Sequence, residues 1–212
     1  PRYDGRCRSR TDHPAGAPYC IRFKLPEGGP IQFDDLIYGS ITIDRQELDD
    51  LVIIKTDGFA SYNFANVIDD SDMHITHVIR GDDHINNTPR QIVMYRALGL
   101  EPPRFAHLPM ILDESRKKLS KRHGAANVLT YREDGVLPEA LLNYIAKLGW
   151  GWGDQEFFTV QVLIEKFTLD RVNKSACAID VDKFRWLCGK HMEAASNERL
   201  GKLWLERLVK ER

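Results

Sequence analysis

A strand, a helix and a second strand follow one another between residues 73 and 112, and this order constrains the fold more than any other feature of the chain. The stretch MHITHVIRG predicts a buried strand with Ile75, Val78 and Ile79 inside. NNTPRQIVMYRALGL predicts a helix, and RFAHLPMIL predicts another buried strand. Two strands joined by a crossover helix form a βαβ unit, so we expect a parallel sheet and an α/β fold.

The limits of the predicted helix are marked by residues that commonly begin and end helices. Thr88 is the expected N-cap, and Pro89 occupies the first helical position. Gln91 lies three residues after Thr88 and would complete a capping box. We expect Gly99 to end the helix at the position after the C-cap.

The chain that precedes this unit has the pattern of β-structure. YCIRFKLP and IQFDDLIYGSITID alternate apolar and polar residues, and EGGP between them predicts a turn. Asp57 and Gly58 lie between two apolar runs in DLVIIKTDGFASYNFA, a pattern typical of a tight hairpin. Residues 1–65 are therefore expected to be rich in strands.

The chain after about residue 136 has helical periodicity instead. Pro138 begins the predicted helix PEALLNYIAKLGW, and Gly149 ends it. SNERLGKLWLERLVKER predicts an amphipathic helix with Ser196 as its N-cap. The residues expected on the apolar faces are Leu141, Leu142, Ile145 and Leu148 in the first helix, and Leu200, Leu203, Trp204 and Leu208 in the second.

Composition excludes several classes of function. The 212 residues are 42% hydrophobic and 29% charged, which is typical of one or two globular domains. No apolar run reaches the roughly 20 residues of a membrane span. The polar, glycine-rich N-terminus does not resemble a signal peptide, so we expect a cytoplasmic protein with no membrane contact. Because the net charge is −1, any binding of nucleic acid needs a local basic patch.

The four cysteines do not indicate a metal site. None of them forms a CxxC pair, which excludes a zinc ribbon and a thiol redox motif. Cys7, His13 and Cys20 could be the remnant of a metal site, but their spacing favours reduced thiols. We therefore expect no protein-bound zinc and no other metal held by these residues.

Polar side chains follow each strand of the predicted βαβ unit. RGDDH comes after the first strand, and RKKLSKRHGA comes after the second. Ligands of open parallel sheets bind at the carboxyl ends of the strands, so we expect the two loops to meet in one crevice. The side chains expected there are Arg80, Asp82, Asp83, His84, Lys118, Ser120 and Lys121.

Two simpler interpretations compete with such a crevice. GDDH could be a turn with solvated charges, and the basic run could be a solvated surface. The carboxylates lack the spacing of an EF-hand, and neither a GxxxxGK[ST] P-loop nor a GxGxxG precedes a helix. If the loops do meet, they could hold a carboxylate through Arg80 and a triphosphate through the lysines.

The KLSKR run, residues 118–122, resembles the KMSKS-type signature of class I aminoacyl-tRNA synthetases. Its surroundings resemble the bacterial glutamyl-tRNA synthetases. The similar stretches are PRYDGRCR, DGFASYNFANVIDDSDMHITHVIRGDDHINNTPRQIVMYRALG, HLPMILDESRKKLSKRHGA and VLTYREDGVLPEALLNYIAKLGWGWGDQEFFT. The resemblance therefore covers nearly the whole chain and is not limited to one short motif.

The resemblance implies an α/β fold: the second half of a class I nucleotide-binding (Rossmann-like) fold with two additions. Residues 1–65 resemble part of the β-rich inserted domain that holds the tRNA acceptor end. Residues 66–135 resemble the second half of the nucleotide-binding catalytic fold with the KLSKR loop. Residues 136–212 resemble the helical stem-contact region that leads toward the anticodon-binding domain.

The resemblance also implies roles for residues that handle the nucleotide. Lys121 would contact the phosphates of ATP and stabilise charge as pyrophosphate departs. Lys118 and Ser120 would shape the loop around it, and all three are expected to act in catalysis. Asp83 and His84 match positions that approach the ATP or the amino acid.

A second set of residues would bind the amino acid. Tyr62 and Asn66, in YNFAN, would line the glutamate pocket. Arg80 would pair with the side-chain carboxylate of glutamate, which a planar guanidinium can hold with two hydrogen bonds. The implied partners are L-glutamate, ATP with Mg²⁺ and tRNA(Glu), and the protein is expected to be a monomer.

One class I signature does not occur in the sequence. HITH and HPAG differ from HxGH, so we expect an internal fragment of a glutamate–tRNA ligase that cannot form glutamyl-adenylate alone. A second hypothesis is a non-catalytic tRNA-binding module on a synthetase-like scaffold, but the intact KLSKR run favours the enzyme. A third is the short paralogue that glutamylates a tRNA base, which the helical continuation after residue 136 disfavours.

Overall fold

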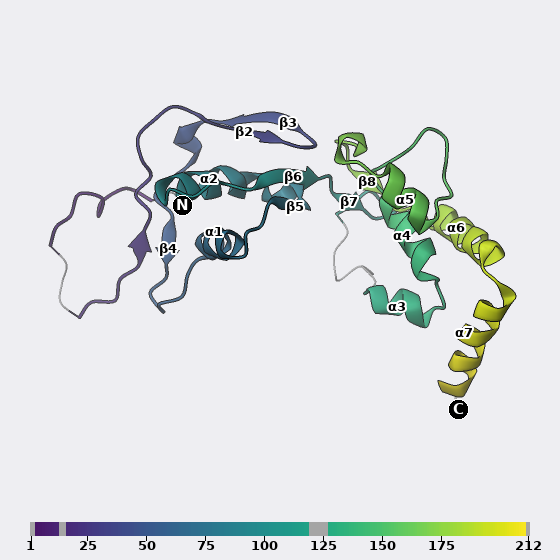
Figure 1. Ribbon diagram of the computed structural model, residues 1–212. Coiled ribbons are helices and arrows are strands. Elements are labelled where there is room, and N and C mark those ends of the chain that lie inside the picture. The colour runs from purple at the N-terminus through teal and green to yellow at the C-terminus, as the bar shows by residue number, and fades with distance from the viewer. Residues whose placement is uncertain (1–2, 13–15, 119–126, 211–212) are drawn as a thin grey trace. The chain divides into compact units, whose positions relative to one another are not determined.

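The computed structural model describes residues 3–12, 16–118 and 127–210, which form two compact units (Figure 1). Unit 1 is residues 1–108, and unit 2 is residues 109–212. The boundary directly follows the second strand of the predicted βαβ unit. The three-part division that the resemblance implies is a division by role, and it stays a prediction.

The predicted βαβ unit is confirmed and forms half of a four-stranded sheet in unit 1. Its strands β5 (His77–Gly81) and β6 (Arg104–Leu108) are parallel and are joined by α2 (Thr88–Ala97). β2 (Ile31–Asp35) lies on the other side of β6, and β3 (Gly39–Ile43) pairs antiparallel with β2. The strand order is therefore β3-β2-β6-β5.

The remaining elements of unit 1 are short apart from one helix. β1 (Ile21–Arg22) and β4 (Val52–Ile54) form a small antiparallel pair. α1 (Tyr62–Asp72) packs against α2. Two 3₁₀ helices, η1 (Arg45–Glu47) and η2 (Asp82–Asn87), complete the unit, and η2 connects β5 directly to α2.

Alternation along β2 builds the core of unit 1. Ile31 and Phe33 point inward while their neighbours are exposed, as expected for a strand with one covered face. The Phe33 ring meets Phe105 of β6 edge-on, with ring centroids 6.3 Å apart. Ile92 and Val93 of α2 join the same buried cluster. Burying each such side chain stabilises the fold by roughly 1.5–3 kcal/mol.

The predicted burial of β5 is only partly right. Val78 packs against the core and Ile75 is partly buried, but 51% of the Ile79 surface is exposed. β5 is the edge strand of the sheet, and successive side chains of a strand point to opposite faces. His77 and Ile79 share the exposed face, whereas Val78 and Arg80 share the covered one.

The capping box predicted at the start of α2 is wrong. Asn87 is the N-cap residue, and no side chain caps the helix. The hydroxyl of Thr88 and the amide of Gln91 both receive hydrogen bonds from Arg80 of β5 instead. Pro89 lies in the first turn, at the second helical position and not the predicted first, whereas the predicted position of Gly99, with φ +69°, is confirmed. The positive φ of Gly99 is a conformation that favours glycine.

The predicted hairpin at Asp57 and Gly58 forms its turn but not its second strand. Gly58 has φ +85°, and the Lys55 amide donates to the Phe59 carbonyl at 2.9 Å. Ile54 and Ala60 form one isolated bridge, and α1 then begins after its N-cap residue, Ser61. The helix buries Val67 against Met94 and Tyr95 of α2, a tertiary contact that the local hairpin pattern does not encode.

Unit 2 is mainly helical, as the sequence predicts from residue 136 onward. Its two-residue strands β7 and β8 pair in parallel. The elements are β7 (Ile111–Leu112), α3 (Val128–Glu133), α4 (Pro138–Lys147), α5 (Val160–Lys166), η4 (Leu169–Arg171), β8 (Cys177–Ala178), α6 (Val181–Ala194) and α7 (Asn197–Lys210).

The helix predicted from Pro138 is confirmed, but its predicted buried face is only partly right, because Leu141 and Leu148 are partly buried and the other two residues are exposed. Leu142 and Ile145 are 45% and 49% exposed, whereas Asn143 and Tyr144 are buried. The buried polar groups have partners, which makes their burial tolerable. Asn143 Oδ1 accepts hydrogen bonds from the backbone amide of Phe158 at 2.8 Å and from His191 at 3.1 Å. The Tyr144 hydroxyl bonds to both backbone groups of Asp180.

An ionic cluster joins α4, α6 and the segment between them. The Lys147 side chain is only 9% exposed, and its ammonium lies 3.3 Å from Glu156 Oε2. Lys183 of α6 lies 2.7 Å from the same oxygen. Burial acts to raise the pKa of Glu156, but the two lysines outweigh it and lower that pKa below its ordinary value.

The predicted C-terminal helix is confirmed as α7. Ser196 accepts a hydrogen bond from the Arg199 amide at 3.3 Å, as an N-cap does. The Arg199 guanidinium also pairs with Glu139 of α4, with one N–O distance of 3.0 Å. The expected apolar stripe lies mostly on the surface, because Leu200 is partly buried but Leu203, Trp204 and Leu208 are exposed.

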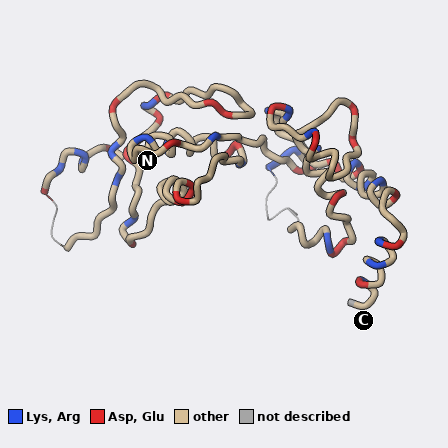
Figure 2. The backbone as a smooth tube through the Cα atoms, in the orientation of Figure 1, with Lys and Arg blue, Asp and Glu red and all other residues tan. Residues whose placement is uncertain are grey.

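Acidic and basic residues are interspersed along each unit (Figure 2). Cys7, Cys20, Cys177 and Cys188 are free thiols. Within the described ranges, no three or more His, Cys, Asp or Glu side chains gather as metal ligands. In the same part of the chain, every helix is too short or too polar to cross a membrane.

Candidate functional site

The guanidinium of Arg80 is the centre of the site in unit 1. Arg80 lies near the end of β5, and its side chain is half-buried under the start of α2. Its Nε donates to Nε2 of His107 at 3.2 Å, and its Nη2 donates to the Thr88 hydroxyl at 2.8 Å and to Gln91 Oε1 at 3.0 Å. We call Thr88, Gln91 and His107 the Arg80 cage.

The buried carboxylate of Asp35 supports the cage by bonding to His107. His107 Nδ1 lies 2.6 Å from Oδ2 of Asp35, and neither side chain is exposed. Asp35 ends β2, and its Oδ1 also accepts from the amides of Ile37 and Tyr38 at 2.9 Å. The parallel register of β5 and β6 places His107 directly beside Arg80. The site therefore depends on three adjacent strands.

The members of the cage are neutral, so they leave the charge of Arg80 uncompensated. Among the described residues, no carboxylate lies within ion-pair distance of its guanidinium, and its Nη1 makes no hydrogen bond. Burial lowers the pKa of Arg80 from its ordinary value, while Tyr62, Asp70 and Tyr95 nearby act in the opposite direction. A half-buried cation with one edge unused is suited to bind an anion from outside.

Asp70 and Tyr95 lie close enough to Arg80 to interact with it electrostatically. Burial raises the pKa of the Asp70 carboxyl, and the positive charge of Arg80 opposes that rise. Burial also raises the pKa of Tyr95 to about 12. The Tyr95 hydroxyl is buried and has no hydrogen-bond partner among the described residues.

α1 supplies three further polar residues to this region. The ring of Tyr62, at the start of the helix, lies 6.1 Å from that of His84. Asn63 accepts a hydrogen bond from Gln91 at 3.3 Å, which links α1 to the cage. Asn66 lies one turn further on and is partly buried, and its side chain makes no hydrogen bond within the described part of the chain. The structure thus brings Tyr62 and His84 together, but it does not connect Asn66 to them.

The acidic pair after β5 forms the start of η2. The Tyr38 hydroxyl donates to Asp82 at 3.1 Å, and burial together with that contact raises the pKa of Tyr38 to about 12. Asp83 and His84 are each about two-fifths exposed, and their closest charged atoms are 4.0 Å apart. Asp82 is therefore anchored by the β2–β3 turn, while Asp83 and His84 remain reachable from solvent.

The predicted lysine loop belongs to unit 2. Lys118 is exposed and forms a bridge with Leu112, the last residue of β7. Ser120 and Lys121 lie outside the described residues. Arg80 and Lys118 lie in different units, so the predicted meeting of the two loops stays a prediction.

Sequence inspection missed four residues of the site, although each had a signal. Thr88 and Gln91 were interpreted as a capping box, because Thr-x-x-Gln is also the pattern of that motif. His107 is a polar residue within an apolar strand, and Asp35 occupies an inward position of an alternating strand. Buried polar residues need partners, so their presence in core positions indicates a network.

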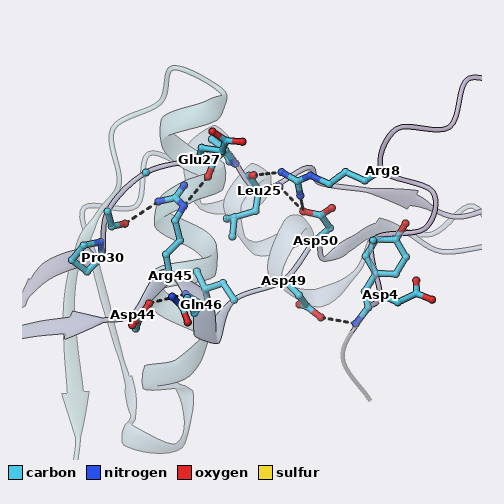
Figure 3. A pocket seen from close by; sticks show the side chains of 16 residues that line it. Asp4, Arg8, Leu25, Glu27, Pro30, Asp44, Arg45, Gln46, Asp49 and Asp50 are labelled. Atoms are coloured by element: carbon cyan, nitrogen blue, oxygen red, sulfur yellow. Dashed lines mark hydrogen bonds and ion pairs between the residues drawn. The ribbon is translucent and has the colours of Figure 1, made fainter.

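A separate pocket of about 550 Å³ lies in the N-terminal part of unit 1 (Figure 3). Most of its charged groups bond to one another or to the backbone. Arg8 pairs with Asp50, and Arg45 donates to backbone carbonyls of the loop 26–29. The pocket shares no lining residue with the Arg80 cage.

Comparisons with known proteins agree on one family. Residues 1–186 match the family model described as "tRNA synthetases class I (E and Q), catalytic domain". A glutamate–tRNA ligase of Legionella pneumophila (strain Lens) is 55% identical over 198 residues, which are 93% of this chain and 42% of that protein. One of Geobacter sulfurreducens is 54% identical over 203 residues, which are 96% of this chain and 44% of that protein.

A solved structure gives the same result in three dimensions. The crystal structure of a glutamate tRNA ligase from Elizabethkingia meningosepticum, in complex with its amino acid, superposes with a TM-score of 0.81. It is 36% identical, and the match covers 92% of this chain and 43% of that one. The chain thus spans less than half the length of the relatives it matches.

Proposed function

Since the chain belongs to the class I tRNA synthetases for glutamate and glutamine, we propose that it carries part of the catalytic apparatus of a glutamate–tRNA ligase. The observation that supports glutamate as substrate is the Arg80 cage, a half-buried guanidinium whose partners are neutral. Its unused Nη1 edge would receive the side-chain carboxylate of glutamate. Tyr62 and Asn66 would line the rest of the amino-acid pocket.

The proposed reaction has two steps. The α-carboxylate of glutamate attacks the α-phosphorus of ATP in line, which forms glutamyl-adenylate and releases pyrophosphate. A terminal ribose hydroxyl of tRNA(Glu) then takes the acyl group, and AMP leaves. Orientation of the reactants and fixed positive charge would supply most of the rate enhancement.

The proposed nucleotide-binding residues come from both units. Asp83 and His84, which are partly exposed after β5, would approach ATP. Lys121 would stabilise the departing pyrophosphate, and Lys118 and Ser120 would shape its loop. Mg²⁺ would arrive with the phosphates of ATP.

The remaining parts of the chain would serve tRNA. We propose that residues 1–65 belong to the domain that holds the acceptor end, and that residues 136–212 contact the stem. Residues 66–135 would form the second half of the nucleotide-binding fold. We further propose a cytoplasmic monomer. Because HxGH does not occur in the sequence, the 212 residues alone should not support ATP–pyrophosphate exchange.

The test uses the complete natural protein that contains this sequence. Lys121→Ala should lower the rate of tRNA charging with glutamate by about 10²–10³-fold, because it removes a positive charge at the leaving group. Binding of tRNA, measured by filter retention, should change less than threefold, as roughly one phosphate contact at most is lost. Lys117→Ala, an exposed neighbour, is the matched control.

Two results would contradict the proposal. Charging that persists at the normal rate in Lys121→Ala would remove the loop from catalysis. An unmodified protein that binds tRNA but never charges it with glutamate would favour the non-catalytic tRNA-binding module instead.

A further inference from the structure

His107 occupies a position in which the hydrogen-bonding roles of both ring nitrogens are fixed. Nδ1 faces the Asp35 carboxylate at 2.6 Å, so Nδ1 carries the proton and donates it. Nε2 faces Nε of Arg80 at 3.2 Å and the Thr88 hydroxyl at 3.1 Å. The Nε of arginine is always a donor, so Nε2 must be the bare, accepting nitrogen. The geometry therefore assigns one neutral tautomer to His107.

Replacing that tautomer would disturb Arg80 directly. A proton on Nε2 would point at the N–H of the guanidinium, and two donors facing each other at this distance repel. Burial lowers the pKa of His107 from its ordinary value, which favours the neutral ring, although Asp35 acts in the opposite direction. The carboxylate of Asp35 thus selects which nitrogen is free to accept from Arg80.

The imidazole also keeps the negative charge of Asp35 away from the guanidinium. Asp35 bonds to His107 and to backbone amides, and among the described residues none of its hydrogen bonds reaches Arg80 directly. A carboxylate in the place of the ring would neutralise Arg80 and compete with an anionic substrate. The neutral ring fixes the orientation of the guanidinium without using up its charge.

We propose that His107, oriented by Asp35, is a positioning residue that holds Arg80 ready for the side-chain carboxylate of glutamate. This inference rests on the proposed function. His107 does not itself touch the substrate; it fixes the plane of the guanidinium so that the N–H groups of Nη1 stay available to donate to the carboxylate. A charged donor held in place favours the anionic carboxylate of glutamate over the neutral amide of glutamine.

Two substitutions in the complete natural protein separate this role from simple packing. His107→Phe keeps a ring of similar size but removes the hydrogen bonds to Asp35, Arg80 and Thr88, and we expect the KM for glutamate to rise about 10–100-fold. The KM for ATP should change less than about threefold, and the preference for glutamate over glutamine should fall. His107→Gln offers an amide that can donate to Asp35 and accept from Arg80, so it should restore most of the glutamate affinity.

Matched controls come from the same strands. His77→Phe makes the same exchange at an exposed position of β5, and Asp34→Asn alters the exposed neighbour of Asp35 on β2. Neither should change the KM for glutamate. Circular dichroism of each variant establishes that it is folded before the kinetics are compared.

A measurement on the unmodified protein tests the tautomer without any substitution or activity assay. Nitrogen-15 NMR of labelled histidine should show one ring with a protonated Nδ1 and a bare Nε2 that persists at neutral pH. A His107 ring with a protonated Nε2, or an imidazolium, would overturn the inference even if His107→Phe does not fold.

The outcomes distinguish this inference from the proposed function. If the unmodified protein charges tRNA with glutamate, but His107→Phe retains the KM for glutamate within about threefold, the positioning role is wrong and the function stands. If His107→Phe raises the KM for ATP and for glutamate equally, the residue acts only on the fold, which also overturns the role. Failure of the unmodified protein to charge tRNA would overturn the proposed function and, with it, the substrate of Arg80.

Discussion

Arg80 in unit 1 and Lys147 in unit 2 are both cations drawn away from solvent, but their surroundings differ. Arg80 bonds to a neutral hydroxyl, a neutral amide and a neutral imidazole. Lys147 lies 3.3 Å from the carboxylate of Glu156, which it shares with Lys183. A buried charge costs stability unless it is compensated within the protein. The cluster in unit 2 compensates its own charges. The Arg80 cage leaves the positive charge of its guanidinium available for a ligand.

This difference separates a charge that supports folding from one that supports binding. In unit 2 the positive and negative groups satisfy one another, so removing one member should weaken the fold and leave substrate binding intact. In unit 1 the cage fixes the orientation of the Arg80 side chain, so substituting Arg80 should weaken substrate binding and leave the fold nearly intact.

The largest effect is expected from Arg80→Lys in the complete natural protein. Lysine keeps the charge but has no planar fork and cannot reach all three members of the cage, so the KM for glutamate should rise about 100-fold. Steady-state kinetics with glutamate and ATP measure it, and Arg96→Lys on the exposed side of α2 is the control. An unchanged KM for glutamate would show that Arg80 is not the carboxylate-binding residue.

Glu156→Ala should weaken the fold and leave the KM for glutamate unchanged. Removing the shared carboxylate leaves Lys147 and Lys183 facing each other and should lower the free energy of unfolding by about 1–2 kcal/mol, allowing for solvent screening of this partly exposed group. All four tryptophans lie in unit 2, so their fluorescence during urea unfolding of the 212-residue chain reports on that unit. Glu165→Ala, on the exposed surface of α5, is the control. A loss of glutamate affinity in Glu156→Ala would contradict the contrast.

Acidification should affect the two regions in different pH ranges. The pKa of folded His107 lies below its ordinary value of 6.5, so below about pH 6.5 the unfolded chain binds a proton that the folded chain does not. The free energy of unfolding therefore decreases as the pH falls toward the pKa of folded His107. The pKa of folded Glu156 lies below its ordinary value of 4.5, so its contribution is lost only below about pH 4.5.

Urea unfolding at a series of pH values tests this order. His107→Gln should flatten the pH dependence that begins below about pH 6.5, and Glu156→Gln should flatten only the part below about pH 4.5. His191 of α6, whose pKa burial also lowers, should leave some dependence in the upper range in both variants. Identical profiles for the two variants would contradict the assignment.

The smallest effects are expected from two tyrosines. Tyr144→Phe in unit 2 removes the hydroxyl that bonds to Asp180 and should cost about 1 kcal/mol of unfolding free energy. Tyr95→Phe in unit 1 removes a hydroxyl with no partner among the described residues, so stability should change by less than about 0.5 kcal/mol. Urea unfolding followed by circular dichroism compares them. A larger loss for Tyr95→Phe would reveal a partner for that hydroxyl.

Sequence patterns predicted the elements of the chain better than their contacts. The βαβ unit, the helix from Pro138 and the turn at Gly58 follow from local periodicity and turn chemistry. The buried face of α4 does not, because Asn143 and Tyr144 are stabilised inside by partners on distant segments. Apolar periodicity assigns such positions to the surface.

In the functional site, too, sequence patterns predicted residues better than their contacts. Arg80 was predicted to bind a carboxylate, and the structure adds the cage that holds it. Thr88 and Gln91 fit a capping box equally well from sequence, because a motif defined by spacing cannot show that Arg80 attracts their side chains. The contact of Asp35 with His107 depends on the register of β2 against β6, which no local pattern specifies.

The separation of Asp35 and His107 by 72 residues has a consequence for the order in which unit 1 folds. A ribosome releases β2 and β3 long before β6, and this hairpin can form early because its contacts are local. β2 cannot meet β6 until the intervening chain has been made and its long loop has closed. We therefore expect the β2–β3 hairpin to form before the sheet is complete, and the Arg80 cage to be among the last parts of unit 1 to form.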